Sequence, residues 1–289
     1  MKEETIAPIT VGFIGQGYIG KNLADNFESR RIPVIRYSEE KEYVGNKDLI
    51  KDCDIVFVAV PTPTIDSKFD GSILEEVIAL TKPGAMVVIK STIVPDFARE
   101  LAAIYPDRFI MVNPEFLNEV TARYDTDNPV RNIIGVPDVD DADWKIRART
   151  VMDLLPKANI GMVCTYEEAS LIKYAGNCFL YTKIIFFNLL HDLVNDYKAD
   201  WNTVVNAVTA DPRIGPAYTE IKHKSGRGAG GHCLVKDFVA FRKLYFMRVG
   251  SDDVDGCSLL INNEMKNKKL LKNSNKDLDI LREVYGKGS

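Results

Sequence analysis

The chain has 289 residues, which is enough for one large or two modest domains. Hydrophobic residues make up 46% and charged residues 27%, a balance that is typical of globular proteins and excludes wholesale disorder. The net charge of −4 argues against a nucleic acid or an anionic membrane as partner, and no apolar run is long enough to span a bilayer.

Two further features indicate a cytoplasmic location. Residues 1–14 enter a strand pattern without the basic and apolar regions of a secretory signal. The cysteines are odd in number and scattered, without CxxC pairs, at Cys53, Cys164, Cys178, Cys233 and Cys257. This spacing favours reduced thiols over a disulfide framework, and we expect no metal site.

The first half of the chain alternates β-branched runs with helical stretches. The expected strands are Ile9–Ile14, Pro33–Tyr37, Asp54–Val60, Ala85–Lys90, Phe109–Val112 and Asn132–Val136. Several of these runs are apolar throughout, as in strands that helices cover on both faces. The pattern predicts βαβ units and an α/β fold with a doubly wound parallel sheet, which forms a first domain over residues 1–164.

A glycine motif follows the first expected strand. The sequence Gly15-Gln16-Gly17-Tyr18-Ile19-Gly20 is a GxGxxG that precedes a helix beginning near Tyr18. Its glycines permit a tight turn and a close approach of the backbone to a pyrophosphate, and the helix N-terminus supplies free N–H groups. This context predicts a Rossmann-type domain that binds NAD.

The end of the second expected strand is less typical of an NAD site. Ser38 stands where an acidic residue usually binds the adenosine ribose, and Glu39 follows one residue later. Ser38 with Arg36 could instead accommodate the 2′-phosphate of NADP. We expect NAD, with NADP as the open alternative.

The second half changes to a helical period. Glu167–Tyr197 predicts one long, mostly apolar helix that is buried between domains or subunits, and shorter helices are expected at Trp201–Ala210, Lys236–Val249 and Asp252–Leu271. The segment Ile214–Gly231 has the composition of an irregular loop. We therefore expect a helical domain over residues 165–262 and a polar tail over residues 263–289 that frays at its end.

Chemistry-bearing residues gather in a few segments. Val58–Pro63, Lys90–Pro95 and Asn113–Glu119 stand at the carboxyl ends of expected strands, where open α/β sheets bind ligands. A glycine-rich segment, Gly228–Asp237, contains Cys233. On the long helix, Lys173 and Asn177 are four residues apart and project from one face.

With Asp211–Gly215, this set resembles the UDP-glucose/GDP-mannose dehydrogenase family over roughly residues 9–262. The resemblance implies an NAD-dependent, four-electron oxidation of the C6 alcohol of a nucleotide sugar to a carboxylate. UDP-glucose is the first substrate to expect, and the product would serve as a polysaccharide precursor. Apolar residues face nearly every direction on the Glu167–Tyr197 helix, so we expect a homodimer whose interface is built on this helix.

The resemblance also implies roles for individual residues. Cys233 would be the nucleophile that captures the aldehyde, and Lys173 and Asn177 would stabilise the oxyanion. Thr92 and Asp237 would position a water, which Glu115 would orient or activate for hydrolysis. Lys236 would favour the thiolate form of Cys233 if its ammonium points that way.

Other residues would contact the two ligands. Arg213 would contact the nucleotide sugar, either of its own subunit or of the partner subunit. The expected cofactor contacts are Gly15, Gly17, Tyr18, Ile19, Gly20, Ser38, Glu39, Val60, Pro61, Thr62, Thr92 and Lys236. The expected substrate contacts are Glu115, Phe116, Leu117, Glu119, Lys173, Asn177, Arg213 and Gly230.

Some of these residues have an ordinary structural alternative. Glu119 is a weaker candidate for hydrolysis, and it suits equally well the N-terminal turn of a helix. His232 replaces the family's usual Ser. The sequence also departs from the family pattern at Ser170, Leu189, Ala229 and Val235.

The length is the largest departure. Family members usually continue into a second Rossmann-like domain that grips the nucleotide, and the chain ends at Ser289, too early to contain it. Three explanations of the length stay open: a shortened enzyme, a piece lacking its last domain, and a homologue adapted to another alcohol.

The alternative functions are a two-electron dehydrogenase of the 6-phosphogluconate or β-hydroxyacid type and an inactive NAD-binding dimerisation module. Cys233 separates the first of these from the four-electron reaction, because only that reaction needs a thiol.

Overall fold

The computed structural model describes residues 9–286, which form two compact units. The first unit consists of the chain up to Thr62 together with Asp70–Lys173, and the second consists of Pro63–Phe69 and the chain from Tyr174 onward. Residues 1–8, on which the expected lack of a secretory signal partly depends, lie outside the described residues. Within the described part, no helix combines the length and apolar character needed to cross a membrane.

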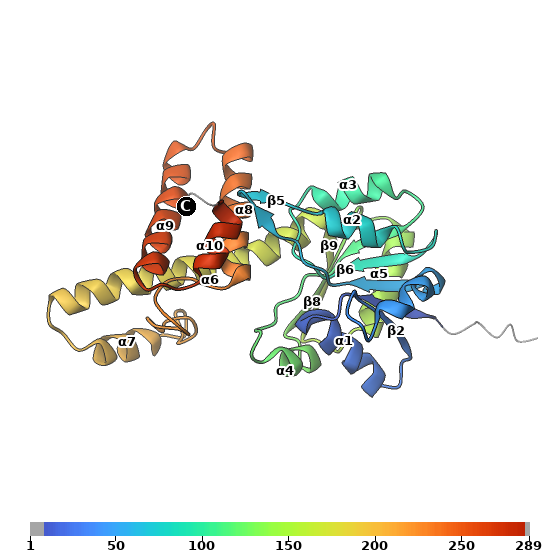
Figure 1. Cartoon of the computed structure of the whole chain (residues 1–289), viewed down its shortest axis with the longest axis horizontal. Helices are drawn as coiled ribbons and strands as arrows, with labels where there is room; N and C mark the ends of the chain where they lie inside the picture. Colours follow the sequence, from blue (N-terminus) through green and yellow to red (C-terminus); the bar gives the residue numbers. More distant parts are fainter. Residues whose placement is uncertain (1–8, 287–289) are drawn as a thin grey trace, which may run out of the picture. The chain divides into compact units, whose positions relative to one another are not determined.

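The first unit is an α/β domain with a mostly parallel sheet of seven strands (Figure 1). The strand order is β2-β1-β3-β6-β7-β8-β9. The strands are β1 (Val11–Ile14), β2 (Val34–Tyr37), β3 (Ile55–Val58), β6 (Met86–Ile89), β7 (Phe109–Val112), β8 (Arg131–Val136) and β9 (Ile160–Thr165). The helices are α1 (Tyr18–Ser29), α2 (Ser72–Ile78), α3 (Phe97–Ile104), α4 (Ala122–Asp127) and α5 (Ala142–Leu154), with a 3-10 helix at Val44–Asp52. The expected doubly wound sheet is thus confirmed in its main features.

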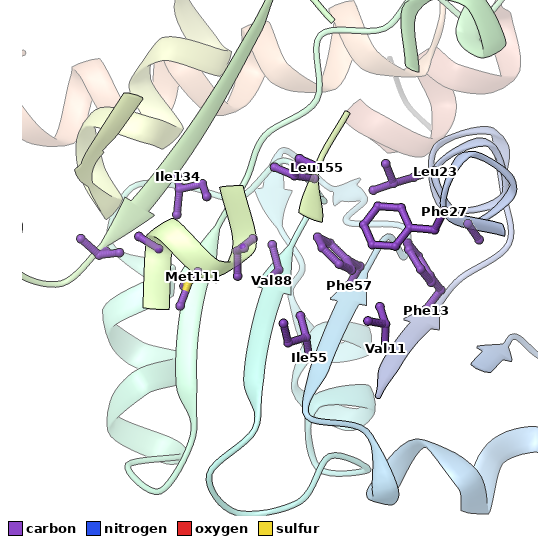
Figure 2. Close-up of a cluster of buried hydrophobic side chains, with 14 residues drawn as sticks. Val11, Phe13, Leu23, Phe27, Ile55, Phe57, Val88, Met111, Ile134 and Leu155 are labelled. Atoms are coloured by element: carbon purple, nitrogen blue, oxygen red, sulfur yellow. The ribbon is translucent and has the colours of Figure 1, made fainter. Parts of the chain in front are cut away.

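The apolar strands of this unit are buried because helices cover the sheet. Alternate residues of the strands pack against α1 and α5 in one hydrophobic cluster (Figure 2). At its centre, the rings of Phe13, Phe27 and Phe57 lie 5.1–5.4 Å apart, stacked or edge to face. Figure 1 shows α2 and α3 on the side of the sheet opposite α1.

Two features of the sheet differ from expectation. The pairing of β7 with β8 is antiparallel, so the sheet is not parallel throughout. The strand β9 was missed because it runs into the next helix without an intervening turn. Thr165 and Glu168 form a capping box at that junction: the Thr165 N–H donates to Glu168 Oε2 at 2.7 Å, and the Glu168 N–H donates to Thr165 Oγ1 at 3.3 Å.

The second unit is mainly helical. Its long helix α6 (Tyr166–Asp196) begins in the first unit, and α7 (Trp201–Thr209), α8 (His232–Arg248), α9 (Val254–Asn273) and α10 (Leu278–Tyr285) follow. A small hairpin of β4 (Thr64–Ile65) and β5 (Lys68–Phe69), which the sequence did not predict, also belongs to this unit. Two-residue strands are too short to leave a period-2 pattern in a sequence.

Residues 262–286 do not form the fraying tail that the sequence predicts. They complete α9 and form α10, and the side chains of Ile280, Leu281 and Val284 pack on Val235 and Val239 of α8. The apolar residues of α10 recur at a spacing of three and four, so one face of this helix is buried although the segment is rich in Lys and Asn.

Candidate active site

The glycine motif forms the turn between β1 and α1. Gly15 has a φ of +89°, and a Cβ on it would lie 2.2 Å from the carbonyl oxygen of Ala59. Since β1 lies between β2 and β3, this close approach marks the point where the strand order reverses, which is where doubly wound sheets bind ligands.

The same turn leaves space for an anion. Gly17 is the N-cap of α1 and makes no side-chain cap, and a Cβ added to it would meet no atom within 4 Å. An uncapped helix N-terminus beside open space suits a pyrophosphate, with Tyr18, Ile19 and Gly20 in the first turn. The chain therefore fits the dinucleotide that its motif predicts.

Hydrogen bonds join the loop that follows β3 to the loop that follows β6, the neighbouring strand. The Ser91 hydroxyl donates to the Val60 carbonyl at 2.7 Å, and the Val60 N–H donates back to Ser91 Oγ at 3.1 Å. The Thr62 hydroxyl donates to the Thr92 carbonyl at 2.8 Å. The expected cofactor contacts Val60, Pro61, Thr62 and Thr92 thus stand on adjacent loops at the carboxyl edge of the sheet.

Arg36 forms ion pairs with two carboxylates of α1. Its guanidinium pairs with Asp25 at 2.6 Å and with Glu28 at 2.7 Å. Ser38 accepts a hydrogen bond from the Glu40 N–H at 3.3 Å, and Glu39 is exposed. Because two carboxylates neutralise Arg36, a 2′-phosphate would have to displace them to reach it, which favours NAD over NADP.

A buried ion pair forms at the end of β7. Lys173 Nζ of α6 donates to Glu115 Oε1 at 2.8 Å, and each of the two side chains is 6% exposed. The other carboxylate oxygen accepts the Leu117 N–H at 2.6 Å, which fixes the side chain from two directions. Phe116 lies against the Arg131 guanidinium, 3.9 Å from ring centroid to Cζ, while Glu119 is exposed.

A second lysine, which sequence reasoning missed, belongs to this cluster. Lys90, at the end of β6, is buried and donates to Asn113 Oδ1 at 2.8 Å. Burial lowers the pKa of Lys90 to about 8; the charge of Glu115 opposes this shift and that of Lys173 adds to it. The available signal was a lysine directly after the apolar run Met86–Ile89, where the strand is too buried for an ordinary solvated side chain.

The second unit holds its own polar network around Asp237 of α8. This side chain is 1% exposed and accepts hydrogen bonds from Asn177 Nδ2 at 2.5 Å and from Lys236 Nζ at 2.7 Å. Both carboxylate oxygens are therefore used. Lys173 and Asn177 lie one turn apart on α6, so the same helix bears a partner of Glu115 and a partner of Asp237.

Cys233 differs from the other four cysteines. It is exposed in the first turn of α8, whereas the other four are buried. Burial raises the pKa of Cys53 and Cys164 to about 11, and burial together with the Asp237 charge raises that of Cys178 further. Thiolate chemistry at neutral pH is thus disfavoured at these three positions.

The remaining expected residue, Arg213, stands in the turn after α7. Its side chain is 88% exposed and pairs with Asp211 of the same turn at 2.6 Å. Gly230 lies in the loop before Cys233, which hydrogen bonds hold to residues of α9 and of the segment between α9 and α10.

Comparison with known proteins relates the chain to one family. Residues 39–151 match the NAD binding domain of the UDP-glucose/GDP-mannose dehydrogenase family, and residues 167–249 match its central domain. An uncharacterized protein of Methanocaldococcus jannaschii is 37% identical over 202 residues, covering 66% of this chain and 22% of that protein. The UDP-glucose 6-dehydrogenase of Streptococcus pneumoniae is 29% identical over 268 residues, covering 78% of this chain and 66% of the enzyme.

A solved structure shows the same fold. A UDP-glucose dehydrogenase from Pyrobaculum islandicum superimposes with a TM-score of 0.75 at 24% identity, covering 92% of this chain and 70% of the other. The chain therefore spans less than the full length of each of these three proteins.

Proposed function

Because this chain belongs to the UDP-glucose/GDP-mannose dehydrogenase family, we propose that it oxidises the C6 alcohol of a nucleotide sugar to a carboxylate with two NAD. UDP-glucose is the proposed first substrate, because the relatives that match both units of the chain include proteins named UDP-glucose dehydrogenases. We also propose that the protein is a cytoplasmic homodimer.

The residues for NAD are those of the turn after β1 and of the loops after β3 and β6. The uncapped N-terminus of α1 would hold the pyrophosphate, with Gly17 leaving the space for it. Bound NAD would supply the hydride acceptor. The pairing of Arg36 with Asp25 and Glu28 supports NAD as the cofactor.

Cys233 would carry the covalent part of the reaction. After the first hydride leaves C6, the thiolate adds to the aldehyde and gives a thiohemiacetal. Loss of the second hydride leaves a thioester, and water cleaves the C–S bond to release the acid and the thiol. Covalent capture keeps the aldehyde from escaping between the two oxidations.

Lys173, Asn177 and Asp237 would serve the oxygen and proton steps. Lys173 and Asn177 would donate to the oxyanion, as a charged and a neutral group. Asp237 and Thr92 would hold the water that relays protons, and Glu115 would activate water for hydrolysis. Lys173 would then exchange its bond to Glu115 for one to the substrate oxygen, which would free the Glu115 carboxylate to act as a base.

The observation that carries this proposal is the exposed Cys233 in the first turn of α8, four residues before the buried, doubly hydrogen-bonded Asp237. The test measures NADH formed per sugar consumed across a panel of UDP- and GDP-sugars. We expect two NADH and one uronate per sugar.

Cysteine variants sharpen the test. Cys233→Ser should abolish uronate formation and leave NAD affinity unchanged, because a hydroxyl is a far weaker nucleophile than a thiolate at neutral pH. Cys257→Ser, at a buried cysteine of α9, is the matched control and should keep the stoichiometry. Normal uronate output from Cys233→Ser would exclude the covalent mechanism.

The same measurement separates the alternatives. One NADH per molecule of substrate and no effect of Cys233→Ser would identify a two-electron dehydrogenase. Tight NAD binding without turnover of any panel member would indicate a binding or dimerisation module.

A further inference from the structure

The loop before Cys233 is held by residues far along the chain. This loop, which we refer to below simply as the loop, comprises Gly226–Gly231. Asn267 of α9 donates to the Ala229 carbonyl and accepts the Ala229 N–H, both at 2.8 Å. Lys276, which is 2% exposed, donates to the Gly228 carbonyl at 2.9 Å.

Asp277 contacts the backbone two residues before the nucleophile. It is the N-cap residue of α10, but its side chain makes no hydrogen bond to that helix. Instead, its Oδ2 accepts the N–H of Gly231 at 2.8 Å, and Gly231 is the N-cap residue of α8. An Asp at an N-cap usually satisfies the N–H groups of its own helix. Here the carboxylate serves the helix that carries Cys233.

The backbone at both ends of this contact is specialised for it. Asp277 has a φ of +50° and Gly231 a φ of +80°. A Cβ on Gly230 would lie 2.1 Å from Asp277 Oδ2 and 2.6 Å from Lys276 Cε. The glycines of the loop therefore allow residues 276 and 277 to approach the backbone closely. This explains why a polar C-terminal segment folds against α8 instead of fraying.

We propose that Asp277 is a positioning residue for Cys233: by accepting the Gly231 N–H it fixes the start of α8 and thereby the place of the thiol. Cys233 is the second residue of α8, so a frayed first turn would displace it directly. The link to catalysis rests on the proposed function, whereas the effect on the loop does not.

The test compares Asp277→Ala with Asp277→Asn, which keeps an acceptor oxygen. Asp279→Ala, at an exposed acid in the first turn of the same helix, is the matched control. Hydrogen exchange of peptides covering residues 226–240 reports on the loop. Iodoacetamide alkylation of Cys233 at pH 7 reports on the thiol, and it is selective because the other four cysteines are buried.

In Asp277→Ala, we expect exchange in the loop to rise at least tenfold and the alkylation rate of Cys233 to change at least threefold, because the thiol is displaced. The NADH yield per sugar should fall from two towards one, because the aldehyde is no longer captured, while the KM for NAD stays unchanged. Asp277→Asn should restore all these values, and Asp279→Ala should resemble the parent protein. A general loss of stability would not confine the defect to the second oxidation.

Unchanged exchange and alkylation in Asp277→Ala would overturn the proposal, as would a loosened loop with parental NADH yield and turnover. If Asp277→Ala does not fold, Gly230→Ala displaces the same carboxylate from the loop side and should give the same pattern. If the parent protein turns over no sugar, the proposed function fails, and the exchange and alkylation measurements still decide whether Asp277 positions the thiol.

Discussion

At the scale of single residues, the buried cluster at the end of β6 and β7 has more positive than negative groups. Two lysines, Lys90 and Lys173, face one carboxylate, Glu115. Lys173 is paired directly with Glu115, whereas Lys90 has the neutral Asn113 as its hydrogen-bond acceptor. The interior therefore holds an ammonium group whose burial is only partly compensated.

This imbalance makes stability depend on pH. The pKa of Lys90 is about 8 in the folded protein against 10.5 as its ordinary value. Between these pH values the unfolded chain holds a proton that the folded chain has lost, so the free energy of unfolding rises with pH. The rise is at most about 1.4 kcal/mol per pH unit.

Denaturant unfolding of the parent protein and of Lys90→Met between pH 7.5 and pH 9.5 measures this effect. Lys90→Met should lack the rise, because it has no group that titrates at this position. Equal slopes in the two proteins would mean that Lys90 keeps an ordinary pKa.

Cofactor preference depends on another single position. The strand end at Ser38 has no carboxylate to bind the ribose hydroxyls, and the Ser38 hydroxyl is already an acceptor for Glu40. We expect Ser38→Asp to raise NAD affinity severalfold and to increase the preference for NAD over NADP, because a carboxylate attracts the hydroxyls and repels a 2′-phosphate. Titration with both cofactors measures the change. An unaltered preference would show that Glu39 or another group already reads the ribose.

At the scale of elements, α6 carries apolar side chains that the rest of the described chain covers only in part. Tyr174, Tyr181 and Phe187 are buried. A second set of side chains remains exposed at spacings of seven, three and four residues, namely Phe179 (67%), Phe186 (56%), Leu189 (49%) and Leu193 (54%). We call this set the α6 stripe. Its spacing is that of a helix seam, and an apolar patch of this kind commonly marks an interface.

The proposed homodimer predicts a clear effect of charge in the α6 stripe. Phe179→Glu with Phe186→Glu should convert a dimer into a monomer, because two carboxylates would be buried unpaired at a two-fold contact. Sedimentation equilibrium should then report the chain mass of 32.4 kDa instead of twice that value. Leu259→Glu on α9, which is 70% exposed outside the stripe, is the control. A parent protein that is monomeric at micromolar concentration would contradict the proposed dimer.

At the scale of the whole molecule, each unit has a core of its own. The cluster around Phe13, Phe27 and Phe57 stabilises the first unit, and the cluster of Val235, Leu281 and their neighbours stabilises the second. Of the expected cofactor contacts, all except Lys236 of α8 belong to the first unit.

This division predicts how core substitutions act on NAD binding. Phe57→Ala should lower the stability of the first unit by about 3–5 kcal/mol, and saturating NAD should recover part of the loss, because it binds only the folded unit. Leu281→Ala should cost about 2–5 kcal/mol and leave NAD affinity unchanged. Thermal unfolding with and without NAD, together with NAD titration of both variants, checks this. A loss of NAD affinity in Leu281→Ala would show that NAD binding also depends on the second unit.

The sequence by itself determined the elements whose signals are local. The apolar strands, the GxGxxG turn and the α6 helix lie close to their expected bounds, because burial on both faces, glycine geometry and a 3.6-residue period all leave marks in consecutive residues. The sequence did not predict the strand β9, because the carboxyl end of this strand is already part of the capping box of α6.

Only the tertiary structure decided which distant side chains meet. Glu115 and Lys173 are 58 residues apart, Asn177 and Asp237 are 60 apart, and Gly231 and Asp277 are 46 apart. A buried carboxylate or ammonium needs partners, but nothing in the neighbouring sequence specifies from which helix they come. The burial of Lys90 and the diversion of Asp277 from its own helix depend on the packing of separate elements, so both stayed hidden until the chain was folded.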